Sequence, residues 1–137
     1  MKALAEVRPV VACSGGDLCI GAFHYGINPS NGQWFGGDPG QGPVGQGASS
    51  DSDGENALIF YSMSGSEAIP IEILEEKYPI RTERWCLRQD SGGPGKFRGG
   101  LVIERDVRSL ADVKVDAIIE KTKFPAWGLF GGKGGLP

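Results

Sequence analysis

Hydrophobic and polar residues alternate along several short segments of the chain, and this pattern predicts a mostly β fold. Burial of every second side chain is typical of a strand that has one face against a core. The segments that alternate in this way, or that are short apolar runs between turn residues, are residues 17–27, 33–35, 57–63, 81–89, 101–107 and 113–119. We expect about seven short strands, joined by long glycine-rich loops.

Turn residues and prolines define where these elements begin and end. Asn28-Pro29 and Asn31-Gly32 are turn signals between the first two segments, which predicts a hairpin there. Pro70 argues against a central strand over residues 69–75, because a proline nitrogen cannot donate a ladder hydrogen bond. Residues 1–12 are compatible with a short helix or a short strand.

The glycine loops indicate a chain that needs partners. Residues 36–56 form a tract rich in Gly, Asp and Ser, and so long a loop either marks a functional interface or counts against an independent fold. The sequence stops at Pro137, directly after another glycine loop and without a closing strand. We therefore expect a single domain over residues 1–137 that is incomplete as a stand-alone unit and is completed by partner subunits.

Composition narrows the class of function. The chain has 23 glycines among 137 residues, and its net charge of −3 argues against a nucleic-acid surface, which needs a basic excess. No apolar run approaches the 18 residues or so of a membrane span. Cys13, Cys19 and Cys86 lack metal-ligand spacing, so we expect buried, reduced thiols of a cytoplasmic protein, with a disulfide or a metal site as the alternative.

The run from Asp90 to Gly100 is the strongest candidate for a site, and two enzymatic interpretations of it fail. The Asp-Ser-Gly-Gly-Pro sequence around Ser91 is close to the nucleophile loop of chymotrypsin-like proteases, but the chain has a single histidine, His24, and is too short for two barrels. A phosphate-binding P-loop needs Ser or Thr after its Gly-Lys pair, and Gly95-Lys96 is followed by Phe97. Five glycines in this run still require close backbone approach or unusual dihedral angles.

Four stretches of the chain, taken in order, are typical of one protein family. They are Gly45-Gln46-Gly47-Ala48 with Asp51-Ser52-Asp53-Gly54, then Pro70 to Pro79, Asp90 to Leu101, and Thr122 to Gly132. Through them, residues 42–133 resemble the C-terminal part of the hydantoinase B family. Its members include subunits of N-methylhydantoinases, 5-oxoprolinases, and acetone and acetophenone carboxylases.

The resemblance implies ATP-dependent chemistry in a multi-subunit enzyme. A small chain of this kind fits best a subunit of a biotin-independent ketone carboxylase similar to acetophenone carboxylase, inactive on its own. Its expected partners are hydantoinase A-like and larger hydantoinase B-like subunits, with a small ketone and bicarbonate as substrates. The alternatives are a subunit of a hydantoinase or 5-oxoprolinase that hydrolyses a cyclic amide, and a non-catalytic assembly subunit. We expect ATP and a divalent metal in the complex, and no cofactor or metal bound by this chain alone.

The resemblance also suggests roles for the candidate loop, although no catalytic residue can be assigned. Its glycines would allow backbones to approach closely, and Asp90 would brace the loop. Lys96 and Arg98 would pair with partner carboxylates or with a phosphorylated or carboxylated intermediate. The candidates for a substrate or interface loop are Asp90, Ser91, Gly92, Gly93, Gly95, Lys96, Arg98, Gly99 and Gly100.

Overall fold

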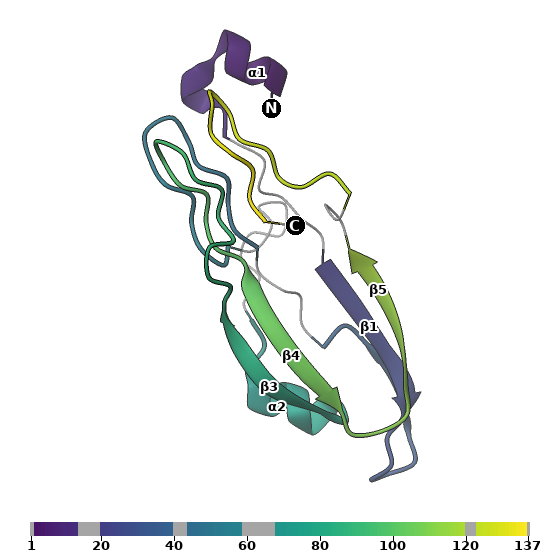
Figure 1. The fold of residues 1–137 in the computed structure, drawn as a ribbon. Coiled ribbons are helices and arrows are strands. Elements are labelled where there is room, and N and C mark those ends of the chain that lie inside the picture. Colours follow the sequence, from purple (N-terminus) through teal and green to yellow (C-terminus); the bar gives the residue numbers. More distant parts are fainter. Residues whose placement is uncertain (1, 14–19, 40–43, 59–67, 120–122, 137) are drawn as a thin grey trace.

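The computed structural model describes residues 2–13, 20–39, 44–58, 68–119 and 123–136. Five strands and three short helical segments lie within these residues (Figure 1). In chain order they are α1 (Lys2–Val7), the 3-10 helix η1 (Pro9–Val11), β1 (Ile20–Ile27), β2 (Trp34–Gly37), α2 (Ile71–Lys77), β3 (Ile80–Leu87), β4 (Ile103–Ser109) and β5 (Val113–Ile119). The prediction of a mostly β chain is confirmed.

The strands form two small antiparallel sheets. One has three strands in the order β2-β1-β5, and the other pairs β3 with β4. β1 and β2 make the predicted hairpin, in which Gly26 pairs with Phe35. Its turn is closed by hydrogen bonds from Asn28 N to Gln33 O at 2.8 Å and from Gly32 N to Asn28 O at 2.8 Å.

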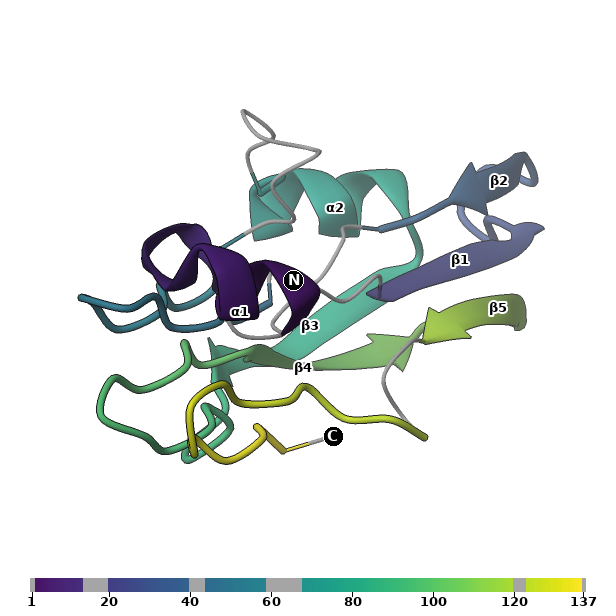
Figure 2. The same ribbon diagram turned by 90° about the horizontal axis from the view of Figure 1, so that it is seen from above.

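A small apolar core lies where α2 and the two sheets meet. It consists of Phe35, Leu74, Tyr78 and Ile80, and Trp85, Val107 and Val113 pack against it. The rings of Phe35 and Tyr78 meet edge to face, with their centroids 6.2 Å apart. Figure 2 shows α2 beside β3, and Figure 1 shows this pair at the end of the molecule away from α1 and the glycine loops. Burial of apolar side chains therefore stabilises the end of the fold that contains α2, whereas the glycine loops at the other end are joined by backbone hydrogen bonds.

α2 is an element that the alternation of residues does not predict. Pro70 occupies the position before the helix, where its lack of an N–H costs nothing, and Glu72 and Lys77 complement the helix dipole at its two ends. Leu74 faces the core and is only 1% exposed. Pro70 thus ends any strand, as expected, and then begins a helix.

Two sequence predictions reach beyond the described residues. Of the strand predicted at 57–63, only residues 57 and 58 are described, and Leu58 makes an isolated bridge with Val44. Residues 17–19 of the first predicted strand also lie outside the described ranges. The five strands present among the described residues are accordingly fewer than the expected number of about seven.

The outer face of the β3–β4 sheet is polar and carries Cys86. The prediction that the thiols are buried is therefore wrong for this cysteine. Cys86 points to this face and is an exposed free thiol, whereas Cys13 is a half-buried one and Cys19 lies outside the described residues. Around it Arg84 pairs with Glu104 and with Asp106, whose Oδ2 lies 2.9 Å from the Arg84 Nε. Because the side chains of β3 alternate, burial of Trp85 on the inner face leaves Cys86 outside.

In the described part of the chain, no helix has the length and apolar character needed to cross a bilayer.

Candidate functional site: a glycine-rich loop cluster

Three glycine-rich segments, residues 44–58, 88–102 and 126–136, run side by side at the end of the molecule opposite α2 (Figure 1). We call them the loop cluster. They are joined through their backbones by hydrogen bonds of 2.8 to 3.1 Å, from Gly54 N to Arg98 O, Gly100 N to Gln46 O, Lys133 N to Pro94 O and Leu136 N to Ser91 O. The predicted site loop is the central segment of this cluster.

Glycine is required here because the backbones approach too closely for a side chain. A methyl group at Gly100 would lie 1.9 Å from the carbonyl oxygen of Glu55, and one at Gly92 would lie 2.0 Å from that of Gly99. Normal C···O contacts are about 3.3 Å or longer. Comparable clashes with backbone atoms would arise at Gly45, Gly54, Gly93, Gly128 and Gly134. The glycine pattern is thus explained by packing of backbone on backbone, before any ligand is considered.

Ser91 acts as a buried bridge across the base of the loop. It is only 4% exposed. Its hydroxyl donates to the carbonyl oxygen of Arg88 at 2.8 Å and accepts from the backbone N–H of Val102 at 3.0 Å. The hydroxyl proton is therefore directed at a carbonyl and not at a base, so the geometry is that of a structural serine.

Two polar side chains from the first segment hold the backbone of the second. Asp53 Oδ1 accepts from Arg98 N at 2.7 Å, and Asn56 Oδ1 accepts from Leu101 N at 2.8 Å. Sequence reasoning did not identify these two residues as partners of the loop. Asp and Asn in glycine-rich loops commonly bind backbone N–H groups, which is the signal that would have drawn attention to them. Which loop these two side chains bind depends on the tertiary packing, which brings residues 98–101 beside them.

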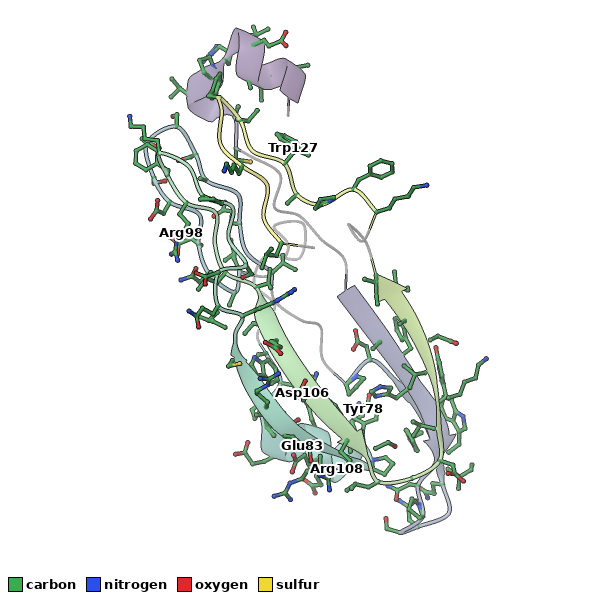
Figure 3. All side chains as sticks on the ribbon, in the orientation of Figure 1. Tyr78, Glu83, Arg98, Asp106, Arg108 and Trp127 are labelled. Carbon is green, nitrogen blue, oxygen red and sulfur yellow. The ribbon has the colours of Figure 1, made fainter. Side chains whose placement is uncertain are left out.

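A cavity of about 260 Å³ lies among the three segments. Seven of the nine predicted site residues line it, namely Ser91, Gly92, Gly93, Gly95, Lys96, Gly99 and Gly100. Asp90 and Arg98 do not, and Figure 3 shows Arg98 apart from Trp127, which lies in the cavity wall. Three aromatic residues and a second cation also line the cavity, namely Phe97, Trp127, Phe130 and Lys133.

The side chains of Lys96 and Arg98 differ in surroundings although both are exposed. Lys96 Nζ lies 5.1 Å from the centroid of the Phe97 ring, at the cavity edge. Arg98 contributes its backbone to the loop cluster, and among the described residues its guanidinium makes no ion pair. Asp90 adopts a left-handed backbone conformation, with φ of 57°, at the start of the run. Only Lys96 of these three can present its charge to a molecule in the cavity.

A second polar cluster, which the sequence did not suggest, lies between the two sheets. The Arg105 guanidinium lies 5.0 Å from the Trp85 ring and donates from Nη1 to Pro39 O at 3.1 Å. Burial lowers the pKa of His24, and the charge of Arg105 lowers it further, while Asp38 opposes both effects. Burial also lowers the pKa of Arg105, again with Asp38 opposing. His24 is therefore neutral near pH 7 and belongs to this cluster, not to the cavity.

No group of three or more His, Cys, Asp or Glu side chains that could hold a metal ion gathers within the described ranges. The arrangement offers mostly apolar and aromatic walls and two lysines around a small cavity. Chemically this suits binding of a small molecule that has an apolar body and a negatively charged group.

Comparison with known proteins identifies similar sequences over the whole chain. The sequence profile described as hydantoinase B/oxoprolinase matches residues 1–137. A protein of Pseudomonas sp., named as the B-type subunit of a putative D-/L-hydantoinase, is 34% identical over 137 aligned residues, which cover 98% of this chain and 22% of the relative. 5-Oxoprolinase 1 of Arabidopsis thaliana is 31% identical over 128 residues, covering 91% of this chain and 9% of the relative.

An uncharacterized protein of Methanocaldococcus jannaschii is 44% identical over 66 residues, covering 48% of this chain and 12% of the relative. The chain therefore spans at most 22% of the length of these three curated relatives.

Proposed function

Because the chain belongs to the hydantoinase B/oxoprolinase family, we propose that it works as part of an ATP-dependent hydrolase that opens a cyclic amide. The observation that carries this proposal is the family match over residues 1–137, with one relative named as a hydantoinase subunit and another as a 5-oxoprolinase. These names favour hydrolysis over the ketone carboxylation that the sequence suggested first. The carboxylase interpretation gains no support from them, and the cyclic-amide alternative takes its place.

Within such an enzyme the chain supplies a scaffold and not the reacting groups. The glycines of the candidate loop are used in backbone packing, and the Ser91 hydroxyl is held by two backbone partners. His24, the single histidine of the sequence, lies in the cluster between the sheets. Nucleotide and metal chemistry then falls to partner polypeptides, of the hydantoinase A type and the larger hydantoinase B type.

The cavity of the loop cluster is the part of the chain best placed to border the substrate. Its volume of about 260 Å³ is close to the lower end of the range for small-molecule pockets, roughly 300–1,000 Å³. Opening a cyclic amide with water breaks a ring C–N bond and creates a carboxylate. Lys96 and Lys133 at the cavity are cations that would stabilise such a negative charge.

The activity is tested in the assembled complex, which comprises this chain and the larger hydantoinase A- and B-type polypeptides of the same organism. We expect ATP-dependent ring opening of hydantoin or 5-oxoproline, measured by chromatography of the opened product together with release of ADP. Acetophenone with labelled bicarbonate serves as the competing substrate. Incorporation of the label without ring opening would overturn the hydrolase proposal in favour of a carboxylase.

The role of the cavity is tested by two cation substitutions on the same loop. Lys96→Ala removes a charge from the cavity edge, and Arg98→Ala is the matched control because its side chain lies outside the cavity. A hydrogen bond to a charged group contributes roughly 1.5–3 kcal/mol, so we expect Lys96→Ala to raise KM about tenfold or more. Arg98→Ala should leave KM unchanged. Equal effects of the two substitutions, or a loss of assembly with normal kinetics in the remaining complex, would assign the loop to assembly alone.

A further inference from the structure

β5 lies at the side of its sheet and has one edge without a partner strand. The strand order β2-β1-β5 gives it a single neighbour, β1, and the pairing runs without interruption from Ile20 opposite Ile119 to Gly26 opposite Val113. Figure 2 shows β1 between β2 and β5. Within the described ranges, no strand pairs with the other edge of β5. The unpaired N–H and C=O groups of such an edge form a template for a further strand.

The side chains of β5 are exposed over most of its length. All six residues from Lys114 to Ile119 are exposed, on both faces of the strand. Val115, Ile118 and Ile119 are 47%, 51% and 56% exposed. Edge strands are commonly shielded by a proline or a β-bulge, and β5 has neither. Its edge is therefore open to a neighbouring strand whose side chains match.

The two charged residues of β5 are complementary to their own symmetry copies. Lys114 and Asp116 lie on the same face, with the lysine Nζ 3.8 Å from the aspartate Oδ1, and their side chains are 78% and 55% exposed. So exposed a pair contributes little by itself. A second copy, antiparallel and related by a two-fold axis at Val115, would place its Asp116 opposite Lys114 and its Lys114 opposite Asp116. Opposite charges directly across two strands stabilise their pairing, whereas like charges destabilise it.

Neighbouring registers lose this match. With the axis at Lys114, that lysine would meet its own copy, and Asp112 would meet Asp116. With the axis at Asp116, two carboxylates would again meet. With the axis at Val115, Asp112 stands opposite Ile118, so no like charges are opposed. The acidic residue just before the strand is thus accommodated, and the charges select one register.

The other face of the paired strands would be apolar. In this register Val115 meets its own copy, and Val113 meets Ala117. Val113 already packs against the apolar core. The inner face of the sheet would therefore continue across the junction, and the pairing would remove the Val115 side chain from water.

We propose that β5 pairs with β5 of a second copy of this chain, antiparallel about a two-fold axis at Val115, and so joins two three-stranded sheets into one. The occupant is a second copy because its charges, read in the opposite direction, are the complement that the edge requires. An interface about a two-fold axis has to be self-complementary in this way. Neither the family match nor the proposed reaction enters into this pairing, so either proposal can fail alone.

Val115→Cys tests the position of the axis. Directly opposite residues of antiparallel strands have Cα atoms about 4.5–5.5 Å apart, a distance that a disulfide spans. In the whole protein as expressed, with Cys86→Ser to remove the exposed thiol, mild oxidation should yield a covalent dimer of Val115→Cys on a non-reducing gel. Ile118→Cys is the matched control, since residue 118 is similarly exposed but would lie about 20 Å from its own copy. No dimer from Val115→Cys, or equal yields from the two variants, would overturn the proposal.

Charge reversal tests the occupant. Lys114→Asp alone, or Asp116→Lys alone, makes both cross-strand pairs repulsive. The dimer Kd of the whole protein, measured by analytical ultracentrifugation, should therefore rise about tenfold or more. The double variant Lys114→Asp/Asp116→Lys restores opposite charges, as does an equimolar mixture of the two single variants. Both should dimerise like the wild type.

A partner with fixed charges gives a different result, because neither combination would restore its binding. Failure of both rescues would overturn the proposal and assign the edge to another polypeptide. A wild type that stays monomeric at every concentration, or single variants with an unchanged Kd, would also overturn it. Because both side chains are exposed, the melting temperatures of the dilute variants should match that of the wild type, which separates lost pairing from misfolding.

Discussion

Gly100→Ala tests whether the loop cluster is held together by backbone packing. The added methyl group would lie 1.9 Å from Glu55 O and 3.0 Å from Gln46 N, so the two segments must separate by roughly 1 Å or more to restore a normal contact. That movement stretches two hydrogen bonds between the segments, from Gly100 N to Gln46 O at 2.8 Å and from Ala57 N to Leu101 O at 2.9 Å. Each buried polar group left unsatisfied costs roughly 1–3 kcal/mol.

The expected loss of unfolding free energy is therefore about 2–4 kcal/mol, a large part of the 5–15 kcal/mol or so that stabilises a typical domain. At a urea m-value of about 2 kcal/mol/M, the middle of the usual range, this lowers the unfolding midpoint by about 1–2 M. Urea titration followed by tryptophan fluorescence measures the change, and Trp127 in the cavity wall reports on the loop cluster itself.

Gly21→Ala is the control for this substitution. Its methyl group would lie 3.5 Å from the nearest atom, Asp38 Oδ2, which is an ordinary contact, and Gly21 does not have a positive φ. Alanine also reduces the freedom of the unfolded chain, so we expect a neutral effect or a gain of up to about 1 kcal/mol. Equal midpoints for Gly100→Ala and the wild type would show that the close backbone approach is not what requires glycine.

Two further predictions concern buried polar groups. Ser91→Ala should lower the unfolding free energy by about 1–3 kcal/mol, because it leaves the Val102 N–H without its acceptor. Turnover per assembled complex should stay unchanged. A loss of turnover in an intact complex would contradict the structural role of Ser91. Burial and the charge of Arg105 lower the pKa of His24 below its ordinary value of 6.5, so the unfolded chain binds the proton first. The urea midpoint should therefore fall as the pH drops below about 6.5. His24→Gln should flatten the dependence of the midpoint on pH between about pH 7 and 5.5. A wild-type midpoint that stays constant over this range would refute the linkage to His24.

The strands that the sequence predicted well are those whose pattern is local. In β3, Trp85 packs on the core side together with Val107 of the partner strand β4, while Arg84, which precedes Trp85, faces outward and pairs with Glu104 and Asp106. This period-two pattern depends only on strand geometry, so it can be seen in a single segment. The hairpin between β1 and β2 was predictable for the same reason, since its turn residues follow one another directly in the sequence.

α2 shows where local pattern stops being sufficient. Ile73, within the helix, is 52% exposed, whereas Leu74 is 1% exposed, and the difference arises from the position of the helix against β3. Pro70 excluded a strand but could not indicate which face of the following residues would be buried. Burial of a short helix is set by the elements that cover it, and those are distant in sequence.

For the candidate site, the sequence by itself determined that the run from Asp90 to Gly100 needs bare backbone and lacks a nucleophile–base pair. Only the tertiary structure decided which backbones meet there, because Gly100 contacts Glu55, which is far away in the sequence, and Ser91 bridges the base of the loop. It also decided that Lys96 borders the cavity while Arg98 does not. A glycine reveals that something must come close, but the identity of the neighbour depends on how the whole chain packs.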